Sequence, residues 1–153
     1  MKRVMLSIAV MLFASVGAQG AITCSINGSL AFGSFNPLLG QSADTTGTIS
    51  VTCVGNPGDS VSYTITLGTG YGSYTARKMV SGTTPLVYNL YRDSECTQVW
   101  GDNTSGTYSV TDSMTLTTTS STKNYVVYSR IASGQNTDPA GSYTDSLLIN
   151  LNY

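Results

Sequence analysis

Apolar and polar residues alternate with a period of two in the hydrophobic segments of this chain. The clearest run is 61–67, where Val61, Tyr63, Ile65 and Leu67 alternate with serine and threonine. Because successive side chains of a β-strand point to opposite faces, this pattern predicts half-buried strands. After the first twenty residues no window has the apolar spacing of an amphipathic helix. The sequence therefore predicts an all-β fold.

Turn residues divide the chain into about seven or eight short strands, which is typical of a single β-sandwich. Turns are expected at Asn27-Gly28 and at 56–59, and a glycine-rich loop at Gly68–Tyr74. The candidate strand segments are 22–26, 30–35, 46–54, 61–67, 77–80, 86–91, 98–100, 108–118, 123–131 and 141–153.

The final segment, Gly141–Tyr153, raises the main functional question. Leu147, Ile149, Leu151 and Tyr153 share one parity, so we expect a strand with one apolar face. No later segment of the sequence is there to pair with its outer edge, and no charged side chain after Asp145 protects it. Either an earlier strand covers this edge or another chain does.

The first twenty residues have the order of a secretory signal peptide. Lys2 and Arg3 precede an apolar run, 4–13, and small residues follow, with cleavage expected near Gly20. The apolar run is too short to span a bilayer, so we expect export, no integral membrane segment, and one domain over 21–153. Without the leader the net charge is about −3, which argues against nucleic-acid binding.

Three cysteines in an exported chain allow at most one intramolecular disulfide. Cys24 and Cys53 both lie in strand-like surroundings and are the expected pair. Cys96 lies in a polar stretch, where it is expected either as a partly shielded free thiol or in an intermolecular bridge.

The composition argues against catalysis. The chain has no histidine, which excludes serine–histidine and cysteine–histidine nucleophile activation and the commonest zinc ligand. Nearly all the acidic residues fall in turns, so we predict no catalytic residue, metal site or cofactor. Aromatic residues near loops, Tyr71, Tyr74 and Trp100, are candidates for stacking on a ligand such as a carbohydrate.

Seven motifs in order along the chain resemble the spore coat protein U domain, the family that includes subunits of archaic chaperone–usher pili. The resemblance covers essentially the whole mature chain. The motifs are Phe32-Gly33-Ser34-Phe35-Asn36-Pro37, Gly47-Thr48-Ile49-Ser50-Val51-Thr52-Cys53, Gly68…Tyr74…Arg77-Lys78-Met79, Leu86-Val87-Tyr88-Asn89-Leu90-Tyr91, Val99-Trp100-Gly101-Asp102, Val127-Tyr128-Ser129-Arg130-Ile131 with Gln135, and Gly141-Ser142-Tyr143-Thr144-Asp145.

The resemblance implies an incomplete immunoglobulin-like sandwich that lacks its last strand and has a Cys24–Cys53 disulfide. A periplasmic chaperone and then a neighbouring subunit would each lend a strand to its open groove, and an outer-membrane usher would assemble the fibre. Family chaperones anchor the C-terminal carboxylate, here on Tyr153. The residues expected to line this acceptor groove are Leu30, Phe32, Phe35, Leu147, Ile149 and Leu151.

Cleavage near Gly20 would leave only residues 21–23 ahead of Cys24, too few to form a donor strand. The leading hypothesis is therefore a surface pilus or coat subunit in a tip-proximal, terminating or non-polymerised position. The alternative is a stand-alone secreted module that binds a carbohydrate or a surface through the aromatic loop residues.

Overall fold

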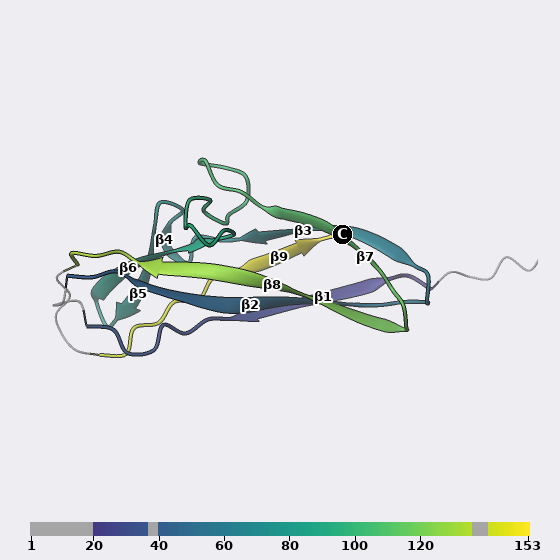
Figure 1. Ribbon diagram of the computed structural model, residues 1–153, viewed down its shortest axis with the longest axis horizontal. Helices are drawn as coiled ribbons and strands as arrows, with labels where there is room; N and C mark the ends of the chain where they lie inside the picture. Colours follow the sequence, from purple (N-terminus) through teal and green to yellow (C-terminus); the bar gives the residue numbers. More distant parts are fainter. Residues whose placement is uncertain (1–19, 37–39, 136–140) are drawn as a thin grey trace, which may run out of the picture.

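The computed structural model describes residues 20–36, 40–135 and 141–153, which form nine strands and no helix (Figure 1). The leader expected at 1–20 lies outside the described residues, except for Gly20. The strands are β1 (Thr23–Ser29), β2 (Ala43–Val54), β3 (Ser60–Leu67), β4 (Tyr71–Ser73), β5 (Ala76–Ser81), β6 (Thr84–Tyr91), β7 (Val110–Thr115), β8 (Ser120–Ile131) and β9 (Ile149–Asn152).

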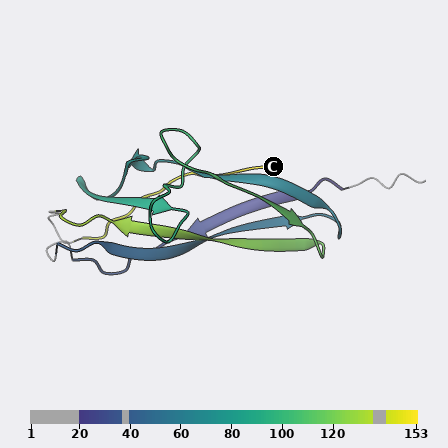
Figure 2. The same ribbon diagram turned by 45° about the horizontal axis from the view of Figure 1, so that its top comes forward.

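Two antiparallel sheets pack face to face, which confirms the predicted all-β sandwich. One sheet has the order β1-β2-β8-β6-β5-β4, and the other has the order β7-β3-β9. In Figure 2 the long strands β2 and β8 run along one layer, with the smaller sheet above them. The paired strands β2 and β8 share a twelve-residue register from Ala43↔Ile131 to Val54↔Ser120.

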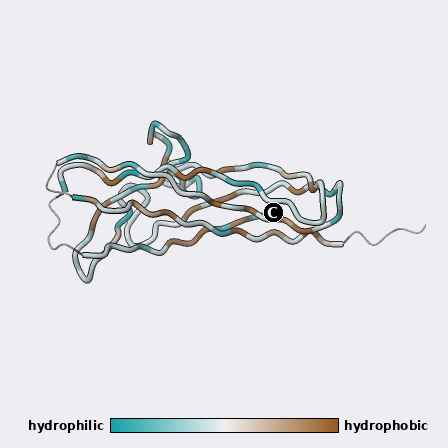
Figure 3. The backbone as a smooth tube through the Cα atoms, turned by 60° about the horizontal axis from the view of Figure 1, so that its bottom comes forward, coloured by the Kyte–Doolittle hydropathy of each residue, from teal (hydrophilic) through white to brown (hydrophobic). Residues whose placement is uncertain are grey.

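The core is built by the alternation that the sequence shows. On β3, Tyr63, Ile65 and Leu67 are buried, while Thr64 and Thr66 between them are more exposed. Brown and pale segments accordingly alternate along the tube in Figure 3. The buried apolar residues of both sheets are Ile49, Val51, Cys53, Tyr63, Ile65, Leu67, Leu86, Tyr88, Leu90, Trp100, Met114, Leu116, Val127 and Ile131.

The expected turn at Asn27-Gly28 is wrong, because β1 continues through both residues. Asn27 pairs with Ser50 and Gly28 with Ile49 in one unbroken register with β2. The expected strand at 30–35 is also wrong. The chain leaves the sheet after Ser29, and Leu30 lies so close to Gly47 that a Cβ at position 47 would be 2.8 Å from the Leu30 Cβ.

The terminal strand is shorter than expected. Only β9, Ile149–Asn152, is regular, and Thr144 forms an isolated bridge with Val80. The pairing of β9 with β3 ends because β3 itself ends at Leu67, after which the Gly68 N–H donates to the Leu148 carbonyl at 2.8 Å. Residues 141–148 therefore cross the end of the sandwich without a neighbouring strand on that sheet.

Candidate functional site

The two sheets each end in an unpaired strand on the same side of the sandwich. β1 is the last strand of the larger sheet, β9 is the last strand of the smaller one, and the two contact each other. Within the described residues neither strand has a hydrogen-bonded neighbour on its outer edge. β9 belongs to the final segment, whose outer edge was expected to need a covering strand.

A cavity of about 1090 Å³ opens along this side and reaches the core of both sheets. Its rim consists of residues 28–36 on one side and of residues 141–147 with Ile149 on the other. Its floor is formed by Ile49, Leu67, Met79, Leu86, Tyr88, Leu90, Val127 and Ile131. The cavity is therefore a groove between the two sheets with an apolar floor.

Five of the six residues expected in the groove line this cavity. They are Leu30, Phe32, Phe35, Leu147 and Ile149. The Phe32 ring meets the ring of Tyr88 edge-on, with 6.0 Å between the centroids.

Leu151 lies on β9 opposite Ile65 and packs partly buried against the core, but it does not line the cavity. Leu151 therefore lies on the edge strand where strand addition was expected, but outside the cavity itself.

Asp145 gives the groove one polar end. Its carboxylate accepts hydrogen bonds from the Tyr88 hydroxyl at 2.6 Å, the Tyr71 N–H at 3.0 Å and the Ser146 N–H at 2.8 Å. Burial, followed by this bond to Asp145, raises the pKa of Tyr88. Asp145 belongs to one of the sequence motifs, yet no spacing rule predicted its bonds to Tyr71 and Tyr88, because these two residues come from other segments of the chain.

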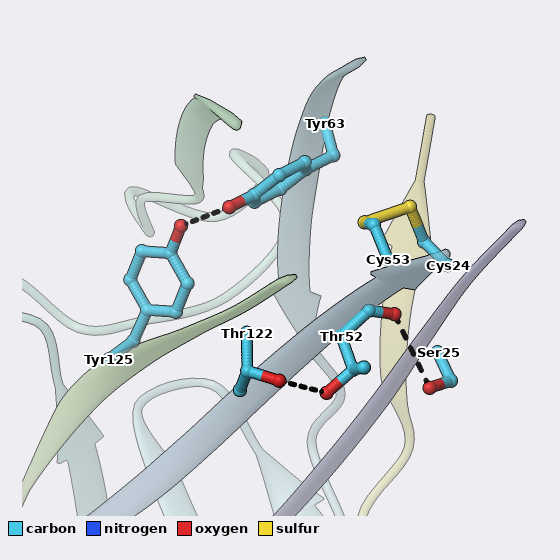
Figure 4. The surroundings of a disulfide bond; sticks show 7 residues. All are labelled: Cys24, Ser25, Thr52, Cys53, Tyr63, Thr122 and Tyr125. Atoms are coloured by element: carbon cyan, nitrogen blue, oxygen red, sulfur yellow. Dashed lines mark hydrogen bonds between the residues drawn. A yellow bond between two sulfur atoms is a disulfide. The ribbon is translucent and has the colours of Figure 1, made fainter. Parts of the chain in front are cut away.

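The predicted disulfide is confirmed. Cys24 and Cys53 are direct partners in the β1–β2 register and form a bond that joins residues 29 apart in sequence (Figure 4). Cys96 is a free thiol, half-buried, at a residue with φ of 57°. Burial raises the pKa of the Cys96 thiol and so favours its protonated form.

The aromatic loop residues do not form a stacking platform. Trp100 is only 1% exposed, and its indole N–H donates to the Ile65 carbonyl at 3.2 Å, so the prediction of a ligand role for Trp100 is wrong. The Arg77 guanidinium lies over the ring of Tyr74, 5.4 Å from its centroid. Of the three, only Tyr71 has an exposed side chain, at 64%.

Arg77 is a buried charge that the sequence did not reveal. It is 0% exposed, and its guanidinium donates to the Gly68 and Trp100 carbonyls and to the Asn89 amide oxygen. Burial lowers the pKa of Arg77. These bonds fix the loop after β3 against Trp100, beside the polar end of the groove.

Two classes of site find no support in the part of the chain that the structure describes. Its cysteine, aspartate and glutamate residues do not gather in threes that could hold a metal ion. It also contains no helix with the length and hydrophobicity that a membrane crossing requires.

A profile described as the Spore Coat Protein U domain matches residues 10–150. The chain belongs to this family. The match extends from before β1 to the first half of β9 and thus includes both walls of the groove. No curated protein matches this spore coat protein U domain significantly.

Among solved structures, the domain is similar to a chain of the CsuC–CsuE chaperone–tip adhesion subunit pre-assembly complex, from the archaic chaperone–usher Csu pili of Acinetobacter baumannii. The TM-score is 0.57 at 20% sequence identity. The match covers 87% of this chain and 40% of that chain, so this chain spans less than half of its structural neighbour. At this identity the likeness establishes a shared fold.

Tyr153, the residue expected to be anchored by a chaperone, directly follows β9. Its side chain is 57% exposed. The structure therefore places it at the end of the same strand that borders the groove.

Proposed function

We propose that this protein is a structural subunit of a surface pilus or coat, and that it is completed by a β-strand from another chain. The observation that carries the proposal is the apolar cavity between residues 28–36 and residues 141–147 with Ile149. These two segments adjoin the edge strands β1 and β9, which lack outer neighbours in the described structure. An extended segment in this position would satisfy backbone groups of an edge and cover the core at the same time.

The chemistry of the groove favours a strand over a small ligand. The floor of the groove is apolar. The unpaired backbone N–H and C=O groups along a sheet edge form hydrogen bonds with the backbone of another strand. Alternate apolar side chains of an inserted strand would each contribute about 1.5–3 kcal/mol by leaving water. The proposed partners are therefore a periplasmic chaperone before assembly and neighbouring subunits afterwards, with an outer-membrane usher between the two stages.

Two further findings support these partners. The chain belongs to the spore coat protein U domain family, and the solved structure that it resembles is of a chaperone–subunit complex from chaperone–usher pili. We therefore propose export through the periplasm to the cell surface.

We also propose a tip-proximal, terminating or non-polymerised position. β1 begins at Thr23, so cleavage after Gly20 leaves only Ala21 and Ile22 ahead of the sandwich, whereas a donor strand needs about six or more residues. N-terminal sequencing of the secreted protein tests this. A mature chain with ten or so residues ahead of β1 would instead fit a position inside a fibre.

The proposed function is tested by two matched substitutions on neighbouring residues. Ile149 lines the groove, whereas Asn150 is exposed on the opposite face of β9. Ile149→Asp places a charge among apolar side chains, at a cost far above that of losing one apolar contact. We expect loss of capture by the cognate chaperone and degradation after export, while Asn150→Asp is captured normally.

The readout is a pull-down of both variants with the cognate chaperone. Equal recovery of the two variants would mean that the edge is not an acceptor. The protein would then be better described as a stand-alone surface-binding module, of whose expected aromatic residues only Tyr71 remains exposed.

A further inference from the structure

Ile149 covers Gly28 at one end of the contact between the two free edges. A Cβ at position 28 would lie 2.9 Å from Ile49 Cγ1 and 3.0 Å from Ile149 Cδ1. The side chain of Ile149 thus reaches from the smaller sheet onto the backbone of β1. Gly28 is extended and paired within β1, with no positive φ, so the position uses the small size of glycine and not its conformational freedom.

This contact divides the seam between the sheets into two parts. The rim of the cavity starts at Gly28 on one side and ends at Ile149 on the other. We call the part beyond it, residues 29–36 facing residues 141–147, the open half. The other part, where β1 approaches β9, is the closed half; Ile26 and Leu151 of this half pack against the core and do not line the cavity.

The closed half is too narrow for another strand. β1 and β9 approach each other with Cα atoms within 8 Å. A strand inserted between two neighbours needs them about 9.6 Å apart, twice the usual spacing of about 4.8 Å. The two edges must therefore separate before a ladder can form along β1 and β9.

We propose that the Ile149–Gly28 contact is a clasp that closes the seam in the unpartnered chain and that an incoming strand displaces. The segment enters at the open half, where the floor of the groove is accessible. It then moves Ile149 off Gly28 and extends along the two edges. The partner is an extended segment with alternating apolar side chains, an assignment that rests on the proposed function. The closure of the seam by Ile149 does not depend on the proposed function.

The clasp predicts that crowding at Gly28 speeds strand uptake. In Gly28→Ala the new methyl group crowds Ile49 Cγ1 and Ile149 Cδ1, so both side chains must shift and the contact of Ile149 with β1 is weakened. The probe is a fluorescent synthetic peptide of about eight residues in which valine alternates with threonine. If about one wild-type molecule in ten is open, the uptake rate rises up to about tenfold.

The matched control is Gly68→Ala, which adds the same methyl group next to Leu148. A Cβ at Gly68 would have its nearest neighbour, the Leu148 carbonyl oxygen, at 3.4 Å, which is ordinary contact. We expect its uptake rate to equal that of the wild type. Equal rates for Gly28→Ala and Gly68→Ala would overturn the clasp.

A cross-link tests the clasp without depending on the folding of Gly28→Ala. In a Cys96→Ser background, Gly28→Cys and Ile149→Cys are combined, and the disulfide between them is mapped by mass spectrometry. We expect the bond to form and the linked protein to take up the peptide about tenfold more slowly than either single-cysteine variant. Failure of the bond to form, or an unchanged rate once it has formed, would overturn the clasp.

The proposed function can fail separately. If no variant and no wild-type protein takes up the peptide, and the chaperone recovers Ile149→Asp and Asn150→Asp equally, the acceptor function is overturned, and the displacement step with it. If the peptide is taken up at the same rate with and without the cross-link, the acceptor function stands and the clasp alone is overturned.

Discussion

Arg77 keeps its charge inside the sandwich by donating to oxygens of three separate segments. The guanidinium bonds the Gly68 carbonyl at 2.8 and 3.0 Å, the Trp100 carbonyl at 2.7 Å and the Asn89 amide oxygen at 2.6 Å. Its planar fork of N–H groups can reach several acceptors at once, which a lysine ammonium cannot do in this geometry. Arg77 is therefore a structural link between β5, the loop after β3, and the bridge at Trp100.

Arg77→Met is expected to destabilise the protein by about 3 kcal/mol or more, because each buried acceptor left without a donor costs about 1–3 kcal/mol. The measurement is urea unfolding of the purified protein. Arg92→Met is the control: Arg92 is exposed and bonds Gln98 and the Ser109 carbonyl, so its loss should cost about 1 kcal/mol or less. Equal losses of unfolding free energy in the two variants would contradict the conclusion that the buried hydrogen bonds of Arg77 stabilise the fold.

Ionisation of Tyr88 makes the free energy of unfolding depend on pH in the alkaline range. Its pKa is raised in the folded protein by burial and by the bond to Asp145, so the folded state favours the neutral phenol. The corresponding stability is fully present below the unfolded pKa of about 10 and is lost as the pH rises toward the folded value. We expect the unfolding free energy to fall above about pH 10.

The comparison of wild type with Tyr88→Phe isolates this effect. The variant loses the bond to Asp145 and is less stable at pH 7, but the fall in its unfolding free energy above about pH 10 should be shallower. The measurement is urea unfolding at pH values from about 7 to about 11. Parallel curves for the two proteins would show that Tyr88 does not titrate differently in the folded state.

For the strands, the alternation of apolar and polar residues was sufficient to predict which side chains face the core, wherever one face of the strand is buried. Val51 and Cys53 on β2, and Ile65 and Leu67 on β3, were placed on the correct face because parity is a property of the segment itself. Asn27-Gly28 misled the prediction because a local turn preference yields to a ladder that a partner strand completes. The close approach of Ile149 to Gly28, which gives the glycine its purpose, involves residues more than a hundred positions apart.

The residues of the groove were predictable only in part, because contacts between distant segments do not follow from a local pattern. Leu147 and Ile149 were expected because the last apolar strand had no partner in the sequence. Leu30, Phe32 and Phe35 came from the family resemblance, and their irregular backbone was not foreseen. Arg77 and Asp145 were missed because their partners are set by loops whose paths no period predicts.

The disulfide stabilises the pairing of β1 with β2 and thus one wall of the groove. Closing a loop of 29 residues contributes about 3–4 kcal/mol through the entropy of the unfolded chain. Cys24→Ser should therefore cost about 2–5 kcal/mol and sharply lower the periplasmic yield. Cys96→Ser should change neither quantity, since Cys96 is a free thiol on a loop. Thermal unfolding and yield of both variants are the measurements, and equal behaviour would contradict this assignment.

Across the whole molecule, the two sides of the sandwich are closed by different means. On the side of β7 and β8, the Tyr63 and Tyr125 hydroxyls are 2.6 Å apart, and Tyr125 donates to Asp112 at 2.9 Å. Lys123 also pairs with Asp112 across the same gap. These polar links join the two sheets directly. On the side of β1 and β9, apolar contact at Ile149 takes their place, and the cavity remains beside it.

This asymmetry predicts that a tethered strand will complete the fold. A segment of about eight residues with alternating valine and threonine is fused after Tyr153 through a flexible glycine–serine linker of about ten residues. The tether raises the local concentration of the strand, so insertion no longer depends on a partner. The inserted valines cover the floor of the groove and add hydrogen bonds to an edge.

We expect the fusion to unfold at a temperature at least about 5 °C higher than the chain without it, and to lose its binding to the chaperone because the groove is filled. The matched control carries serine in place of each valine: it has the same length and backbone but no apolar side chains to bury, and its unfolding temperature should equal that of the unfused chain. A rise in both fusions would point to the linker, and a rise in neither would show that the seam between β1 and β9 does not accept a strand.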